Sequence, residues 1–192
     1  MALIGCNNFH YSVMKTADTN TAAPTYDDST GMTAIPNLVH CNVNPATNTA
    51  TLYADNGPAE TATTISEVTV EVETADIPLK DLAALLGHTY DETNNSILAK
   101  MSDTAPYVAI AFASQKSDDG VRLVKLFKGK FHEPNEDART KGQNVSFATK
   151  TITGTFVQLA NDSSWKLTED VTKADADTKM AAFFKSVLKS ST

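Results

Sequence analysis

Apolar and polar residues alternate at a spacing of two over much of the chain, which is typical of β-strands with one buried and one solvated face. The clearest case runs from Ile65 to Glu73. Its two faces hold different residues: Val68, Val70 and Val72 on one, and Glu67, Thr69, Glu71 and Glu73 on the other. We therefore expect one face to join a core and the other to form an acidic surface.

Further strands are expected over residues 32–43, 49–54, 107–115, 121–132 and 144–159. Between the third and fourth of these lies the segment Lys116 to Gly120, whose Asp-Gly dipeptide favours positive backbone φ and predicts a hairpin. Polar, Pro- and Gly-containing segments predict loops at 16–31, 44–48, 55–63 and 133–142.

The spacing changes to that of a helix in two places. Over residues 76–87 a leucine stripe follows Pro78 and ends at Gly87, which predicts a short helix that packs on the sheet. Over residues 175–189 apolar residues recur at i, i+3, i+4, i+7 and i+8, which predicts a C-terminal helix. These residues are Met180, Phe183, Phe184, Val187 and Leu188.

The whole chain, residues 1–192, is expected to form one domain, because 41% hydrophobic residues fill one core and neither a linker nor a repeat divides the sequence. The order of the elements predicts a mainly β fold, an antiparallel β-sandwich or barrel with a short flanking helix and a C-terminal helix.

Charge and hydropathy narrow the function. The formal net charge of −7 repels phosphate, which argues against a conventional nucleic-acid-binding protein. Nowhere do 18 apolar residues follow one another, and the first residues lack the pattern of a secretory signal. We therefore expect a protein made in the cytoplasm that does not enter a membrane.

Candidate catalytic chemistry is sparse. The chain contains no Gly-x-Ser-x-Gly, no phosphate-binding Gly-rich loop and no His-Glu-x-x-His, so we expect neither an enzyme nor a cofactor. Glu133 and Glu136 suit a pair of glycosidase carboxylates by residue type, but their place beside Pro134 favours a solvated turn. His88 and His132 have no nearby partner pattern and are interpreted as surface or turn histidines.

Two cysteines and two histidines leave alternatives open. Cys6 and His10 could meet His40 and Cys41 in a metal site, although the spacing is not that of a zinc finger and free thiols are favoured. A single disulfide between the cysteines is the other alternative. Lys125 is expected on the strand face opposite to Lys128 and Lys130, which argues against an anion site.

Several segments together resemble the major tail proteins of long-tailed, non-contractile bacteriophages of Gram-positive bacteria. They follow one another along nearly the whole chain, in the order in which those proteins show them. They are Met1-Ala2-Leu3-Ile4-Gly5 with the strand Phe9 to Val13, an Asn-rich strand from near residue 35, Ala50 to Pro58 with its Tyr-Ala-Asp-Asn-Gly passage, the alternating Val68 to Val72, the helix Leu79 to Gly87, the paired strands Val108 to Ala113 and Val121 to Phe127, and Val145 to Thr149.

The resemblance implies a tail tube fold that forms six-fold rings, which stack into a tube and guide genome DNA to the host. It implies a non-catalytic protein of the virion tail, made in the cytoplasm of the bacterial host. The implied partners are further copies of the chain, the tape measure protein, the tail tip or distal tail proteins, the tail terminator and, in passage, double-stranded DNA.

The resemblance also suggests roles for polar residues. Glu67, Thr69, Glu71 and Glu73 become candidates for the lumen, because a negative wall does not bind DNA. Candidates for contacts between subunits lie in the loops 16–31 and 55–63: Asp27, Asp28, Asp55, Asn56, Gly57, Pro58 and Glu60. The alternative is a surface- or carbohydrate-binding β-sandwich module of a tail tip or adhesin, for which one Trp and 7% aromatic residues are a thin supply. A small hydrolase is the third possibility, and it lacks a nucleophile and a base.

Overall fold

The structure is a computed structural model that describes residues 2–136 and 148–188, and its elements are mainly β-strands. The strands are β1 (Leu3–Thr16), β2 (Thr25–Tyr26), β3 (Thr33–Ile35), β4 (Leu38–Ala54), β5 (Gly57–Thr74), β6 (Thr89–Asp91), β7 (Ser96–Leu98), β8 (Val108–Lys116), β9 (Val121–Phe131), β10 (Lys150–Val157) and β11 (Lys166–Val171). The helices are α1 (Leu79–Leu86), the 3₁₀ turn η1 (Lys173–Asp175) and α2 (Ala176–Phe183). The mainly β class, with antiparallel pairing and two helices, is as predicted.

The main sheet curls back on itself. Its strand order is β2-β1-β8-β9-β10-β5-β4, and every neighbouring pair is antiparallel. β3 pairs with β1 at one end of this order, and only Pro36 and Asn37 separate it from β4 at the other end. The segment from β3 to β4 therefore links both ends of the sheet. The strand expected over 32–43 is interrupted at Asn37, whose φ is 60°.

The inside of the curled sheet holds the larger core. Val68, Val70 and Val72 of β5 are fully buried there and meet side chains from β1, β8 and β10. α1 covers this core with Leu82, Leu85 and Leu86, and it ends at Gly87 in the left-handed conformation, as the sequence predicted. The alternation expected for Ile65 to Glu73 is thus confirmed.

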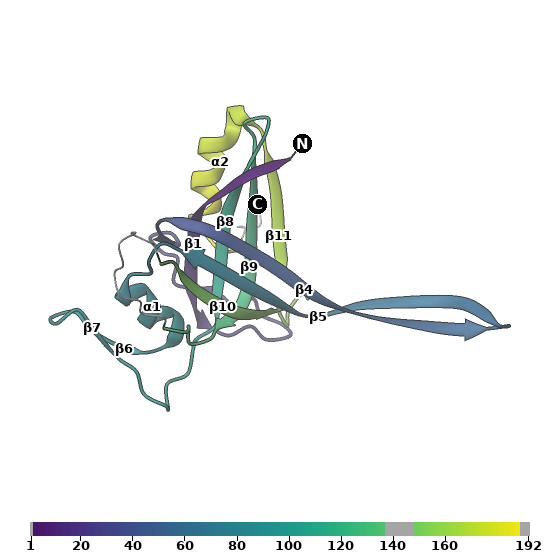
Figure 1. Ribbon diagram of the computed structural model, residues 1–192, viewed down its shortest axis with the longest axis horizontal. Coiled ribbons are helices and arrows are strands. Elements are labelled where there is room, and N and C mark those ends of the chain that lie inside the picture. Colours follow the sequence, from purple (N-terminus) through teal and green to yellow (C-terminus); the bar gives the residue numbers. More distant parts are fainter. Residues whose placement is uncertain (1, 137–147, 189–192) are drawn as a thin grey trace, which may run out of the picture.

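A second core lies on the other side of β8 and β9. β8 pairs with one edge of β9. Two strands pair with the other edge: β11 over Val121 to Leu126, and β10 over Lys128 to Phe131. The C-terminal segment covers this region with Phe183 and Val187, both buried. Figure 1 shows α2 lying along the body beside β8 and β9.

The C-terminal helix is shorter than the sequence suggested. Apolar spacing predicted a helix over 175–189, whereas α2 ends at Phe183 and the chain continues irregularly to Leu188. The ammonium of Lys125 donates hydrogen bonds to the carbonyl oxygens of Phe183 and Ser186, at 2.8 and 2.6 Å. These bonds satisfy carbonyls that a continued helix would use, so Val187 is buried without being helical. Residue 189 lies outside the described residues.

Lys125 and Lys128 reach the same side of the sheet, so the expectation of opposite faces was wrong. The register of β9 on β8 shifts between Val108 and Ile110, which interrupts the alternation of β9. Lys128 therefore pairs with Asp18 at 2.5 Å, beside Ala160, while Lys125 contacts Phe183.

The loop expected at 44–48 is strand, and so are residues 57–63 of the loop expected at 55–63, of which Asp55 and Asn56 remain a turn. β4 has 17 residues and β5 has 18, and they pair from Leu38 with Thr74 down to Ala54 with Gly57. In Figure 1 the two strands cross the body together and continue beyond it as a hairpin, which we call the arm and define as residues 44–67. Of the other predicted segments, residues 137–142 of the loop and 144–147 of the last strand lie outside the described residues.

Candidate functional site: an acidic face and an extended arm

The candidate lumen residues lie on one polar face built by β4, β5 and β10. The three strands are neighbours, and their residues oppose each other in rows. The rows are His40, Glu73 and Thr151; Asn42, Glu71 and Thr153; and Asn44, Thr69 and Thr155. We call these nine residues, with Glu67, the acidic face.

The acidic face is the reverse side of the larger core. Val70, Val72 and Ile152 alternate with its residues and are at most 1% exposed. Glu67, Thr69 and Glu71 are exposed, and Glu73 is half-buried. The sequence identified the β5 residues; it missed those of β4 and β10, although the alternation in Asn42-Val43-Asn44 and in Thr151-Ile152-Thr153 carried the same signal.

The acidic face is negatively charged, because it holds three carboxylates and none of the three rows contains a lysine or an arginine. Glu73 accepts a hydrogen bond from the hydroxyl of Thr149, a neutral group. At the border of the face lies Lys130, which opposes Thr155, and its ammonium is 4.6 Å from the ring centre of Tyr107. Phosphate is therefore repelled over most of the face.

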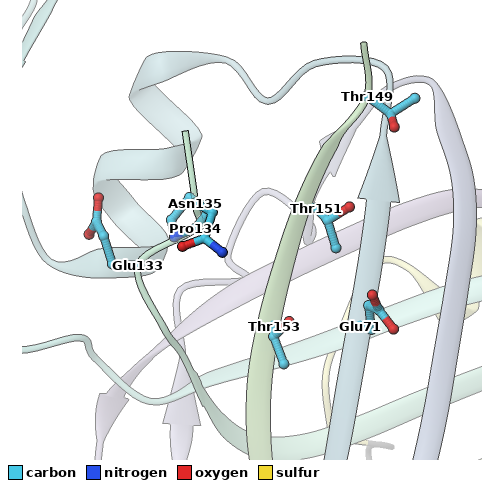
Figure 2. A pocket seen from close by; sticks show the side chains of 7 residues that line it. All are labelled: Glu71, Glu133, Pro134, Asn135, Thr149, Thr151 and Thr153. Carbon is cyan, nitrogen blue, oxygen red and sulfur yellow. The ribbon is translucent and has the colours of Figure 1, made fainter. Parts of the chain in front are cut away.

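A shallow polar pocket of about 400 Å³ opens on this face. Its walls come from β5, from β10 and from the segment after β9, and the lining residues are Glu71, Glu133, Pro134, Asn135, Thr149, Thr151 and Thr153. Figure 2 shows Glu71 beside Thr153 on neighbouring strands, with the side chain of Glu133 pointing away from them. These residues offer hydrogen-bonding groups and charge, but no hydroxyl activated by a histidine among them.

The two glutamates of the glycosidase alternative have separate partners. A carboxylate oxygen of Glu133 lies 2.9 Å from Nε2 of His88, and one of Glu136 lies 3.6 Å from Nζ of Lys150. Both glutamates are exposed, as the interpretation as a solvated turn predicted. His88 was expected to be a surface or turn histidine without a nearby partner. It does directly follow the turn at Gly87, but its side chain is 9% exposed and has two carboxylate partners, so the expectation of no partner was wrong.

The arm is a regular hairpin with a minimal turn. Asp55 and Asn56 form it with φ of 49° and 64°, as a two-residue type I′ turn requires. Apart from the half-buried Gly57, every residue from Asn44 to Glu67 is exposed, including Leu52 at 62% and Tyr53 at 71%. Of the candidates in 55–63, Asp55 and Asn56 thus form the turn at the tip of a strand pair, and Gly57, Pro58 and Glu60 lie in β5.

The candidates of the other loop lie on the body. Asp27 pairs with Lys15 at 2.8 Å, and Asp28 accepts a hydrogen bond from the backbone N–H of Val187. The same segment is fixed by the hydroxyl of Tyr26, which donates to the carbonyl of Phe127 at 2.8 Å. The structure therefore does not bring Asp27 and Asp28 together with the tip of the arm.

Among the described residues, the possible metal ligands of the sequence do not form one cluster, although Cys6 lies near Cys41. His10 stacks on Phe184 at 4.1 Å between ring centres, whereas Cys41 packs against the larger core, and burial raises its pKa to about 12. Cys6 and Cys41 are both free thiols. Across residues 2–136 and 148–188 no three His, Cys, Asp or Glu side chains are grouped as metal ligands.

Comparisons with protein-family models and with curated proteins find no match to this chain. In the part of the chain that the structure describes, no helix has the length and apolar character needed to cross a membrane.

Proposed function

We propose that the chain is a structural subunit that assembles with copies of itself into stacked rings, the tail tube of a long-tailed, non-contractile bacteriophage. In this role it acts in the virion tail, catalyses nothing and lets double-stranded DNA pass through the lumen. The tape measure, tail tip and terminator proteins are its further partners.

The arm carries this proposal. A two-stranded hairpin is only marginally stable in water when no third strand or helix supports it. Within residues 2–136 and 148–188 the arm packs against neither core: β5 pairs with β10 only from Val68 onward, and β4 pairs with β5 alone along the arm. A hairpin this long and exposed is therefore best explained by a surface on another subunit that supports it.

The composition of the arm favours a protein partner. From Asn44 to Glu67 the residues charged at neutral pH are Asp55, Glu60 and Glu67, and the rest is mainly Thr, Ala and Asn. Such depletion of charge is typical of the centre of a protein interface and unsuited to nucleic acid. Along the arm, the outer edges of β4 and β5 pair with no other strand in the part of the chain that the structure describes, so both can pair with a strand of a partner.

A second copy of the chain is a natural partner, because an arm that binds the body of another copy makes a head-to-tail contact. Contacts of this kind close into rings or continue as filaments. The acidic face then suits the lumen, since Glu67, Glu71 and Glu73 keep phosphate from binding along the path of the DNA.

The proposal is tested by electron microscopy of the concentrated full chain, alone and with tail tip proteins as a template. We expect rings or hollow rods of uniform width. The matched control lacks residues 49–63 and joins Asn48 to Thr64, a cross-strand pair, through an Asn-Gly turn. It should stay folded and monodisperse. Monomers of the wild-type chain under both conditions, or rods from the shortened chain, would contradict the proposal.

A further inference from the structure

His88 joins three segments that are far apart in the sequence. It directly follows Gly87, where α1 ends, and its Nδ1 lies 2.9 Å from a carboxylate oxygen of Asp103, in the segment between β7 and β8. Its Nε2 lies 2.9 Å from a carboxylate oxygen of Glu133, just after β9. The backbone is close-packed at this point, because a Cβ at Gly87 would collide with the carbonyl of Thr104.

This geometry defines the charge of the imidazole. A carboxylate only accepts hydrogen bonds, so each ring nitrogen must carry a proton to bond its partner. Both bonds are therefore present together only in the imidazolium form. In a neutral imidazole one nitrogen is an acceptor and faces an acceptor, so one of the two bonds is lost.

We propose that His88, Asp103 and Glu133 form a pH-operated clasp, which in its protonated state fixes the segment 133–136 to the end of α1. The clasp opens when His88 loses its proton. This inference rests on the contacts of His88 alone and is independent of the proposed tube assembly.

The two partners of His88 differ in their other contacts. Asp103 is 14% exposed and also accepts a hydrogen bond from the backbone N–H of Lys100, at 2.9 Å. Glu133 is 65% exposed, and among the described residues His88 is the one partner of its carboxylate. Glu133 is therefore the partner that is released, and the bond to Asp103 remains.

The direction of the pH effect follows from the pKa of His88. Hydrogen bonds to Asp103 and then to Glu133 raise this pKa above its ordinary value, against the smaller opposing effect of burial. Hydrogen bonds from the backbone N–H of Lys100 and then from His88 lower the pKa of Asp103, and the charge of Lys100 adds a smaller effect in the same direction, so that carboxylate stays ionised. The clasp is closed below the ordinary histidine pKa of about 6.5 and opens as the pH rises through the higher value in the folded protein.

Opening the clasp frees one wall of the pocket on the acidic face. Glu133, Pro134 and Asn135 line that pocket opposite Glu71. On the other side of Glu133, the backbone N–H of His132 donates to the carbonyl of Thr153 at 2.8 Å, and this bond does not depend on His88. The clasp thus controls Glu133 to Glu136 and leaves β9 in place.

The test is an NMR titration of the full chain between pH 5 and 9, following the ring signals of His88 and the backbone amides of Asn135 and Glu136. We expect His88 to titrate clearly above about 6.5 and both amides to shift with the same midpoint. Glu133→Gln should lower the midpoint of His88, and Asp103→Asn should lower it as well. In His88→Gln the amides should no longer shift over this range.

A matched control is Glu136→Gln, which removes a carboxylate from the same segment but not from the clasp. It should leave the midpoint of His88 unchanged. A midpoint at or below about 6.5 in the wild-type chain, or amides that do not follow His88, would overturn the clasp. Neither result bears on tube formation, which electron microscopy tests separately.

Discussion

At the scale of single residues, the buried cation Lys125 attaches the C-terminal segment to the sheet. Lys125 is 2% exposed, bonds the carbonyls at the end of α2 and lies 4.0 Å from the ring centre of Phe183. A positive charge at a helix C-terminus is favourable, because the free carbonyls there are the negative end of the helix dipole. Lys125 therefore caps the helix and stabilises its packing.

Lys125→Met should lower the free energy of unfolding by about 1–3 kcal/mol, because the buried carbonyl of Phe183 loses its donor while the volume is nearly kept. Urea denaturation measures the change. Lys179→Met on the exposed side of α2 is the control and should stay within about 0.5 kcal/mol of the wild type. Equal losses in the two variants would show that Lys125 has no special role.

Asp18 makes stability depend on acid pH. Burial by itself would raise the pKa of Asp18, but hydrogen bonds from Lys128 and from the backbone of Ala160 outweigh it, so the pKa is lowered. A carboxylate with a lowered pKa stabilises the fold above its unfolded value of about 3.9, and the contribution is lost as the pH falls through the folded value.

Asp18→Asn should therefore be less stable than the wild type at pH 6, and the difference should shrink below about pH 4. Thermal unfolding between pH 2.5 and 7 measures it. A difference that stays constant over this range would mean that the ionisation of Asp18 does not contribute.

At the scale of elements, the arm and the body should differ in local stability. The arm depends on backbone pairing and on contacts such as that between the hydroxyls of Thr49 and Thr63, at 3.3 Å. β8 and β9 are buried between two layers. Stability against local opening follows the number of buried apolar contacts.

Hydrogen exchange should show this difference. In the unassembled chain, amides paired across the arm, such as Thr49 with Thr63, should exchange orders of magnitude faster than those pairing Ile110 with Leu126. Assembly should slow exchange in the arm. Arm amides that are as protected as β8 before assembly would mean that the arm is stable without a partner.

The arm also explains which strands the sequence failed to predict. Hydrophobic alternation marks a strand only where one face is buried, and it was correct for Val68 to Val72. Residues 44–48 and 57–63 have two exposed faces, so nothing selects apolar residues at every second position. The Asp-Asn-Gly passage was a usable signal for a tight turn, but without alternation around it the segment resembled a loop.

At the scale of the whole molecule, charge is distributed so that one face repels DNA. Replacing Glu67, Glu71 and Glu73 with lysine changes the net charge from −7 to −7 + 6 = −1. We expect this variant to bind double-stranded DNA in a gel-shift assay, with an affinity that falls steeply with salt, while the wild type does not bind.

The control for this prediction carries the same net charge elsewhere, by replacing the exposed Asp118, Asp175 and Asp177 with lysine. It should bind DNA more weakly, because its new charges are not gathered on one face. Equal binding by the two variants would mean that net charge alone decides and that the acidic face has no special role.

By itself the sequence determined the features that depend on neighbours along the chain. The leucine stripe and Gly87 defined α1, the Asp-Gly passage defined the hairpin of β8 and β9, and alternation separated Val70 from Glu71. Local geometry and burial are sufficient to select residues at these positions.

Only the tertiary structure decided the features that depend on distant partners. Glu71 gained Asn42 and Thr153 as neighbours through strand order, and His88 gained Asp103 and Glu133 through the packing of three loops. The sequence around a lone histidine or an exposed threonine contains no pattern from which its partner can be predicted. The role of such a residue arises when the fold brings together residues tens of positions apart.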